Sequence, residues 1–111
     1  MQDAVGAALI DHEHLARQTF GDAELARDLL GLFAEQCRRL VPGILDPGLS
    51  AAERADLAHT LKGSALGVGA ERIARLSASI EDALRAGAPA TAACRLSDAV
   101  ADTLSVLPPA S

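Results

Sequence analysis

The chain has 111 residues, a formal net charge of −5, two phenylalanines and neither tryptophan nor tyrosine. This length suits one domain, which can bury about two-thirds of the surface that the unfolded chain exposes. Alanine and leucine dominate, and both favour helices over strands. Because the charge is negative and no basic run is present, nucleic acids and anionic membranes are poor partners. No uncharged apolar run approaches the ~18 residues of a membrane span.

The cysteines and the chain ends indicate the compartment. Cys37 and Cys94 belong to neither a Cys-x-x-Cys pair nor a Cys/His metal spacing, so we expect both to be small core residues. Asp3 and the lack of a basic segment before the first apolar stretch argue against a secretory signal. We therefore expect a cytoplasmic protein with reduced thiols. The initial methionine and the Pro108-Pro109 tail favour a stand-alone protein.

Two helices are expected in the first half of the chain. Asp11 can cap a short helix that runs to about Thr19. Asp22 can cap a longer one, which Asp46-Pro47-Gly48 ends. Apolar residues at helical spacing mark the longer helix: Leu25, Leu29, Leu32, Phe33, Leu40 and Ile44.

A third helix is predicted from Ser50 to Gly69. Ser50 and Glu53 form a capping-box pattern, and Gly69 suits the left-handed residue that ends many helices. The residues expected on its inward face are Leu57, Leu61, Ala65 and Val68.

Two further helices complete the chain. One starts near Ala70 and stops at Ala86-Gly87, and the other opens at Pro89 and ends before Pro108. The inward residues of the first are Ile73, Leu76, Ile80 and Leu84, and those of the second are Leu96, Val100, Leu104 and Leu107.

Four long amphipathic helices joined by short loops imply antiparallel neighbours. The predicted fold is therefore all-α, an up-down-up-down four-helix bundle with a short extra helix at the N-terminus. We expect one domain over residues 1–111, with the four-helix core at about 22–107. The sequence contains no internal repeat and no strand candidate.

The most informative residues lie in the third predicted helix. The chain has a single lysine, Lys62, three residues after His59, and its nine other basic side chains are arginines. Residues three or four apart share a helix face, so His59, Lys62 and Gly63 stand together. The predicted outward face also holds residues that would form a docking surface: Ala55, Asp56, Leu66 and Gly67.

This patch suits phosphoryl chemistry. An isolated histidine on a helix is usually an ordinary surface residue, but here glycines and a lysine accompany it. Imidazole, with an unperturbed pKa near ~6.5, is mostly the neutral nucleophile at neutral pH. Lys62 supplies a point charge for a phosphoryl oxygen. Gly63, which costs roughly 1 kcal/mol relative to alanine inside a helix, leaves the imidazole uncovered for a partner's active site.

The segment His59-Thr60-Leu61-Lys62-Gly63-Ser64-Ala65, with Gly69 ten residues after the histidine, resembles the signature of histidine phosphotransfer (HPt) domains. These domains are four-helix bundles that pass phosphoryl groups between receiver-domain aspartates in multistep phosphorelays. The resemblance implies that His59 is phosphorylated through Nε2, that Lys62 stabilises the phosphoryl group and that Gly63 keeps the site open.

The residue 22 positions after the histidine departs from the commonest family pattern. Many members carry a glutamine there, whereas this chain has Glu81, which resembles the phosphotransfer domain of chemotaxis histidine kinases. A carboxylate at this place would accept a hydrogen bond from the ring nitrogen opposite the reactive one, fixing the tautomer and raising basicity. The alternative is an exposed carboxylate paired with Arg85 four residues on. The phosphoryl donor is then either a receiver aspartate or the ATP-bound domain of a kinase.

The expected partners are response-regulator receiver domains and a (hybrid) histidine kinase, with the chain acting as a monomeric carrier. No Gly-x-x-x-x-Gly-Lys-Ser/Thr motif is present, so we expect no ATP site, no cofactor and no enzyme activity of its own. His12 and His14 are two residues apart on a helix and do not suggest a metal site.

Two alternatives to this interpretation belong to other classes of protein. One is a purely structural helical interaction bundle, which would expose a wide apolar stripe. The other is the dimerisation domain of a sensor kinase, which normally has an acidic residue directly after its histidine and a proline shortly beyond; the segment after His59 has neither.

Overall fold

The computed structural model describes residues 9–107, and all of the regular structure in that range is helical. This confirms the predicted all-α class. The helices are α2 (His12–Gln18), α3 (Ala23–Ile44), α4 (Ala51–Val68), α5 (Glu71–Arg85) and α6 (Ala93–Ser105). None of the helices in this range is both long and apolar enough to cross a membrane.

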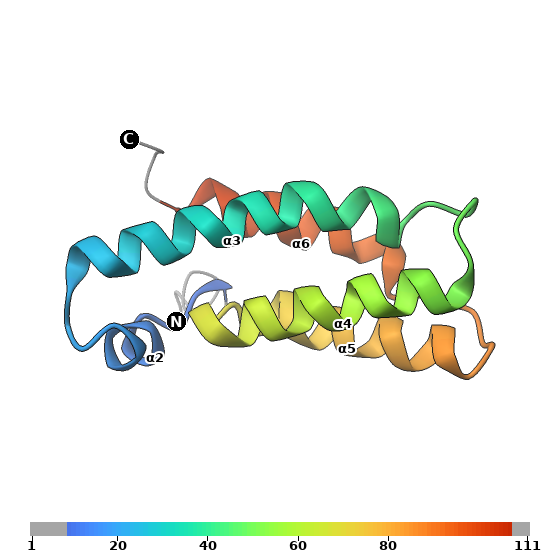
Figure 1. Ribbon diagram of the computed structural model, residues 1–111, viewed down its shortest axis with the longest axis horizontal. Helices are drawn as coiled ribbons and strands as arrows, with labels where there is room; N and C mark the ends of the chain where they lie inside the picture. The colour runs from blue at the N-terminus through green and yellow to red at the C-terminus, as the bar shows by residue number, and fades with distance from the viewer. Residues whose placement is uncertain (1–8, 108–111) are drawn as a thin grey trace, which may run out of the picture.

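The four longer helices lie with their long axes roughly aligned. Figure 1 shows α3 and α4 in front, with α6 behind α3 and α5 behind α4, and the chain reverses direction from each long helix to the next. The short α2 lies at the end where α3 begins, against α3 and α4. The long helices thus enclose one core and leave the outer face of α4 and α5 to solvent.

The predicted helix ends that rest on side-chain caps are confirmed. The carboxylate of Asp22 accepts a hydrogen bond from the amide of Leu25 at the start of α3. At the start of α4, Ser50 and Glu53 exchange the two hydrogen bonds of a capping box, each 3.1 Å. Gly69 ends α4 in the left-handed conformation, with φ of 77°.

Gly69 also joins α2 to the bundle. Its carbonyl accepts a hydrogen bond of 2.8 Å from the amide of Asp11, the residue that caps α2. A Cβ added at Gly69 would lie 2.8 Å from the carbonyl oxygen of Asp11. This position therefore needs glycine for its backbone conformation and for the close approach of the neighbouring chain.

The start of the last helix differs from the prediction. α6 begins at Ala93, four residues after Pro89, and no side chain caps it. Residues 91 and 92 form a turn instead, closed by the bond from the amide of Ala93 to the carbonyl of Ala90. The segment between Gly87 and Ala92 is the connection from α5 to α6, and its alanines carry no side-chain signal that marks the helix start.

The core is built mainly from aliphatic residues, and three residues predicted from apolar character do not belong to it. Leu25 and Leu32 of α3 are exposed, and so is Cys94 near the start of α6. Cys37 is fully buried as predicted, and burial raises the pKa of its thiol to about 11. Cys94 is exposed because it lies two residues before Leu96, on the side of α6 opposite to its buried residues Leu96, Ala99, Val100 and Thr103.

The buried face of α4 is also rotated relative to the prediction. Leu61, Ala65 and Val68 are buried, but Ala55 and Ala58 share that face and Leu57 is only half-buried. Apolar residues surround most of this helix, so spacing alone does not select one face. Small side chains at the inward positions let α4 pack closely on α5.

Candidate functional site

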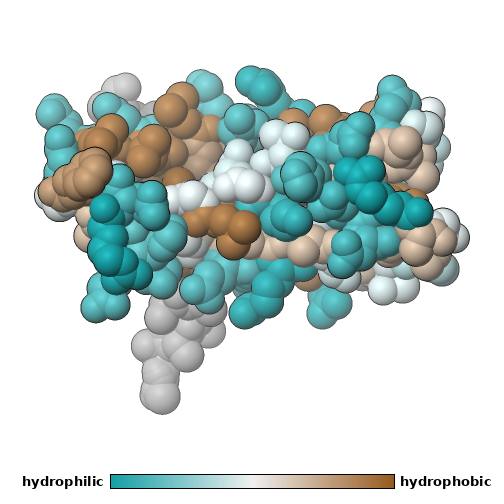
Figure 2. All heavy atoms as spheres, turned by 60° about the horizontal axis from the view of Figure 1, so that its bottom comes forward, coloured by the Kyte–Doolittle hydropathy of each residue, from teal (hydrophilic) through white to brown (hydrophobic). Residues whose placement is uncertain are grey.

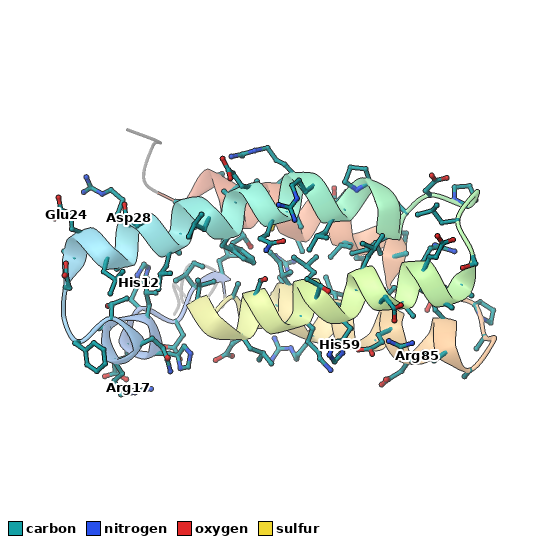
Figure 3. All side chains as sticks on the ribbon, viewed as in Figure 1. His12, Arg17, Glu24, Asp28, His59 and Arg85 are labelled. Atoms are coloured by element: carbon teal, nitrogen blue, oxygen red, sulfur yellow. The ribbon has the colours of Figure 1, made fainter. Side chains whose placement is uncertain are left out.

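His59 lies in the middle of α4, on the side turned away from α3. Its side chain is 62% exposed. Figure 3 shows His59 and Arg85 on the same lower edge of the molecule, one from α4 and the other from α5, well away from His12 on α2. The imidazole is therefore open to a macromolecular partner.

Glu81 reaches the imidazole from α5. The Nδ1 atom of His59 lies 3.2 Å from Oε1 and 3.1 Å from Oε2 of this carboxylate. Glu81 is buried, because α5 places it in the line of contact with α4. An ionised carboxylate accepts hydrogen bonds but has no proton to donate. Nδ1 of His59 therefore carries the proton in this contact. Nε2, on the opposite side of the ring, is then the atom with the free lone pair.

Two cations hold the same carboxylate. Nζ of Lys62 lies 3.4 Å from Oε1 of Glu81, and Nε of Arg85 donates to Oε2 at 2.9 Å. Glu81 therefore contacts the histidine and also pairs with Arg85 one helical turn later, but it is buried and so is not the exposed carboxylate of the alternative interpretation. Burial by itself raises the pKa of Glu81, but the hydrogen bonds from Arg85, His59 and Lys62 outweigh burial and lower that pKa below its usual value.

Arg85 makes a second contact that the sequence did not suggest. Its Nη2 donates to Oδ1 of Asp56 on α4 at 3.0 Å. Asp56 precedes His59 by three residues, which places both on one face of α4. Helical spacing predicts that Asp56 and His59 share one face of α4 and that Glu81 and Arg85 share one face of α5. It does not predict that these two faces lie against each other.

The surface beyond His59 along α4 is uncovered. A Cβ added at Gly63 or at Gly67 would meet no atom within 4 Å. Leu66, between them, is exposed. These three residues lie on the outward side of the helix, as predicted.

Ala55 corrects the predicted docking surface. It is fully buried, and so it cannot contact a partner. Ala55 lies on the face of α4 that packs on its neighbours, whereas the sequence pattern predicts it on the outward face. Asp56 is exposed as expected, but it is engaged with Arg85.

A hollow of about 330 Å³ lies between α3 and α4, beside Gly67. Exposed Leu32 lines it, and Oε1 of Gln36 is buried there without a hydrogen-bond partner. Figure 2 shows hydrophobic residues gathered at the left of the visible face, the end where α3 begins. The other residues of the lining are Gln18, Leu29, Phe33, Ser64 and Val68. Sequence spacing assigned the α3 leucines to the core and so missed this surface.

No group of three or more histidine, cysteine, aspartate or glutamate side chains in residues 9–107 is arranged to hold a metal ion. His12 and His14 both belong to α2, and Figure 3 shows His12 away from His59.

The comparison with protein-family models matches the Hpt domain over residues 28–107. Comparison with curated proteins and with solved structures finds no significant match. The matched range contains the four longer helices from the second turn of α3 onward, and with them His59, Lys62 and Glu81. Since it covers well over half of the chain, the protein belongs to the Hpt domain family.

Proposed function

We propose that this protein is a histidine-containing phosphotransfer protein of a multistep phosphorelay, which reversibly carries a phosphoryl group on His59 between receiver-domain aspartates. Membership of the Hpt family implies histidine phosphotransfer in two-component signalling. The observation that carries the assignment to His59 is its exposed imidazole with Nδ1 held by Glu81. We further propose that the chain is a single cytoplasmic domain of up-down-up-down topology, without an ATP site of its own.

The chemistry follows from the ring geometry. Nε2 of His59 attacks the phosphorus of an aspartyl phosphate on the partner. The N–P bond forms while the P–O bond to the aspartate breaks, and the aspartate leaves as a carboxylate. The imidazole gains positive charge during this step, and the ionised Glu81 at Nδ1 stabilises that charge. The same reaction in reverse then transfers the phosphoryl group from Nε2 of His59 to the aspartate of a second receiver.

Lys62 supplies the charge that the phosphoryl oxygens need. In the unphosphorylated protein its ammonium rests 3.4 Å from Glu81 and is one-third exposed. The four-carbon stem lets it turn from that carboxylate to an oxygen of the phosphoryl group on Nε2. Lysine suits this exchange because a point charge can leave one oxygen and meet another without a fixed planar geometry.

The surface next to His59 fits a receiver domain as its partner. Gly63 and Gly67 leave room for the rim of the partner's active site, because an added Cβ at either would stand in open space. The hollow beside Gly67, with exposed Leu32 and Leu66, offers apolar area to a helix of the same receiver. Docking there is continuous with His59 along α4, so one partner can reach both.

A second candidate donor is supported by the contact between Glu81 and His59. In the phosphotransfer domains of chemotaxis-type kinases a glutamate at this offset orients the imidazole, and the phosphoryl group comes from ATP bound to a kinase domain. The acceptor residue and the role of Lys62 would be the same, and only the donor would differ.

The deciding experiment offers the protein two labelled donors: phosphorylated receiver domains, and a chemotaxis-type kinase domain with labelled ATP. We expect acid-labile label from the receivers, and none in the His59→Gln variant. Because His59 is exposed, that variant should keep the helical content and unfolding midpoint of the wild type. Label from the kinase domain alone would favour the second candidate. Label that persists in His59→Gln would overturn the assignment of the site.

A further inference from the structure

Glu81 is held from three directions, and the three contacts are unequal. His59 and Arg85 both approach Oε2, at 3.1 and 2.9 Å, whereas Lys62 approaches Oε1 at 3.4 Å. The contact from Arg85 is the shortest of the three. Arg85 is in turn tied to α4, because its Nη2 donates to Asp56 at 3.0 Å. One guanidinium thus connects a carboxylate on α5 to a carboxylate on α4, next to the imidazole.

The two cations differ in what happens to them during phosphotransfer. In the proposed function, Lys62 leaves Glu81 to meet the phosphoryl group. Arg85 does not move to the phosphoryl group, because its two hydrogen bonds direct it toward Glu81 and Asp56. After Lys62 has moved, Arg85 is the one arginine or lysine among residues 9–107 still bonded to Glu81. Without it the carboxylate could rotate about its side-chain torsions, away from Nδ1.

We propose that Arg85, anchored by Asp56, is a positioning residue for His59: it holds the Glu81 carboxylate against Nδ1 while Lys62 moves to the phosphoryl group. This inference rests on the proposed function and adds two residues to its site. Arg85 and Asp56 touch neither the phosphoryl group nor the reactive nitrogen, so both act through Glu81.

The planar guanidinium explains why this position needs arginine. Nε and Nη2 point in fixed directions, so one side chain can bond Glu81 and Asp56 together. A lysine at residue 85 could satisfy one carboxylate and would leave the other free. Arg85→Lys should therefore keep the charge near Glu81 while losing the connection to α4.

A purely structural role predicts a different outcome. The side chains of Arg85 and Asp56 are 46% and 75% exposed, and exposed ion pairs contribute little to stability. Removing Arg85 should then change the unfolding midpoint little and leave the imidazole unaltered. The positioning role instead predicts a change at His59 that exceeds any change in stability.

The chain provides a matched control. Arg72 also lies on α5 and pairs across helices, with Asp102 of α6 at 3.4 Å, and its exposure is close to that of Arg85. Arg72→Ala removes an equivalent surface ion pair without touching Glu81 or His59. The variants to compare with it are Arg85→Ala, Arg85→Lys and Asp56→Asn.

The first measurement is the ¹⁵N NMR spectrum of the His59 ring at about pH 8.5, where imidazole is neutral. It reports the share of the tautomer with the proton on Nδ1, and it does not depend on phosphorylation. We expect this share to fall in Arg85→Ala, to fall less in Arg85→Lys and Asp56→Asn, and to stay at the wild-type value in Arg72→Ala.

The second measurement is the transfer rate from a phosphorylated receiver. The net effect of one hydrogen bond corresponds to about a two- to tenfold change in rate, and we expect Arg85→Ala to slow transfer within that range. Wild-type tautomer and rate in both Arg85→Ala and Asp56→Asn would overturn the proposal. If the wild type accepts no label while Arg85→Ala still shifts the tautomer, the proposed function fails and the positioning role stands.

Discussion

Nδ1 of His59 lies 3.1 Å from Oε2 of Glu81, although the two residues are 22 positions apart in the chain and come from different helices. This contact fixes which ring nitrogen faces solvent. Because an ionised carboxylate accepts but cannot donate, the proton stays on Nδ1 and the lone pair of Nε2 points outward. A partner therefore meets the nucleophilic atom without a rearrangement of the ring.

The lowered pKa of Glu81 predicts a pH dependence of stability. The hydrogen bonds that lower this pKa exist in the folded state, so the unfolded chain binds a proton more readily. Glu81 therefore stabilises the fold above its ordinary pKa of 4.5, and this contribution is lost as pH falls through the lower folded value. In urea unfolding between about pH 6 and pH 3, the free energy of unfolding should fall more steeply with decreasing pH for the wild type than for Glu81→Gln.

Glu13→Gln is the control for that series. Glu13 is 90% exposed and its contact with Arg17 is 4.0 Å long. Its removal should leave the pH dependence of the wild type unchanged. Equal slopes for the wild type and Glu81→Gln would mean that the network around Glu81 does not persist in solution.

The sequence predicts the extents of the helices well, but it predicts poorly which face of each helix is buried. Caps are local, because Ser50 needs only Glu53 three residues away, and such signals identify helix ends. The outward position of Leu32 depends on how α3 is turned against α4, which no residue of α3 determines alone. The same holds for Arg85: its pairing with Glu81 follows from spacing, but its bond to Asp56 requires the two helices to face each other.

Access over Gly63 can be tested by filling the space. Gly63→Leu should stabilise the fold by up to about 1 kcal/mol, since leucine favours helices and an added Cβ meets nothing within 4 Å. The same side chain should stand over the approach to His59, so transfer from a receiver should fall at least about tenfold. Unfolding midpoints and transfer rates measured on one preparation would separate the two effects.

Gly31→Leu is the matched substitution for that test. Gly31 is also exposed inside a helix, with nothing within 4 Å of an added Cβ, but it lies on α3. It should gain similar stability and keep the wild-type transfer rate. If both leucine variants transfer at the wild-type rate, access over Gly63 does not matter.

Substitution of Gly69 should destabilise the fold, in contrast to substitution of Gly63. Its φ of 77° disfavours any side chain, and an added Cβ would lie 2.8 Å from the backbone oxygen of Asp11. Gly69→Ala should therefore destabilise the protein by more than about 1 kcal/mol, because the backbone contact cannot relax by a rotamer change. Denaturant unfolding of this variant beside Gly63→Ala tests the assignment. Equal midpoints for the two alanine variants would contradict the close packing of Gly69 on Asp11.

The two thiols should differ sharply in reactivity. Burial raises the pKa of Cys37 to about 11, which leaves almost no thiolate near neutral pH, whereas Cys94 is exposed. A thiol reagent should therefore label one cysteine of the native protein quickly and the second only after unfolding. Cys94→Ser should remove the fast phase. A fast phase that survives in that variant would mean that Cys37 is accessible.

The apolar surface beside His59 should govern partner affinity and leave the chemistry unchanged. Leu32 lines the hollow between α3 and α4, and Leu66 adjoins Gly67; both are more than half exposed. Truncation of a leucine that becomes buried in a complex typically costs about 1–2 kcal/mol of binding. Leu32→Ala and Leu66→Ala should each weaken receiver binding by about five- to thirtyfold, which titration calorimetry would measure.

Transfer at saturating receiver should remain at the wild-type rate in both variants, because Leu32 lies on α3 and Leu66 faces outward two turns of α4 beyond His59. Val106→Ala is the control, since Val106 is also an exposed aliphatic residue but closes α6. It should bind receivers as the wild type does. Wild-type affinity in the Leu32→Ala, Leu66→Ala double variant would show that receivers dock elsewhere, and a lower rate at saturation would show that these leucines also orient the reacting groups.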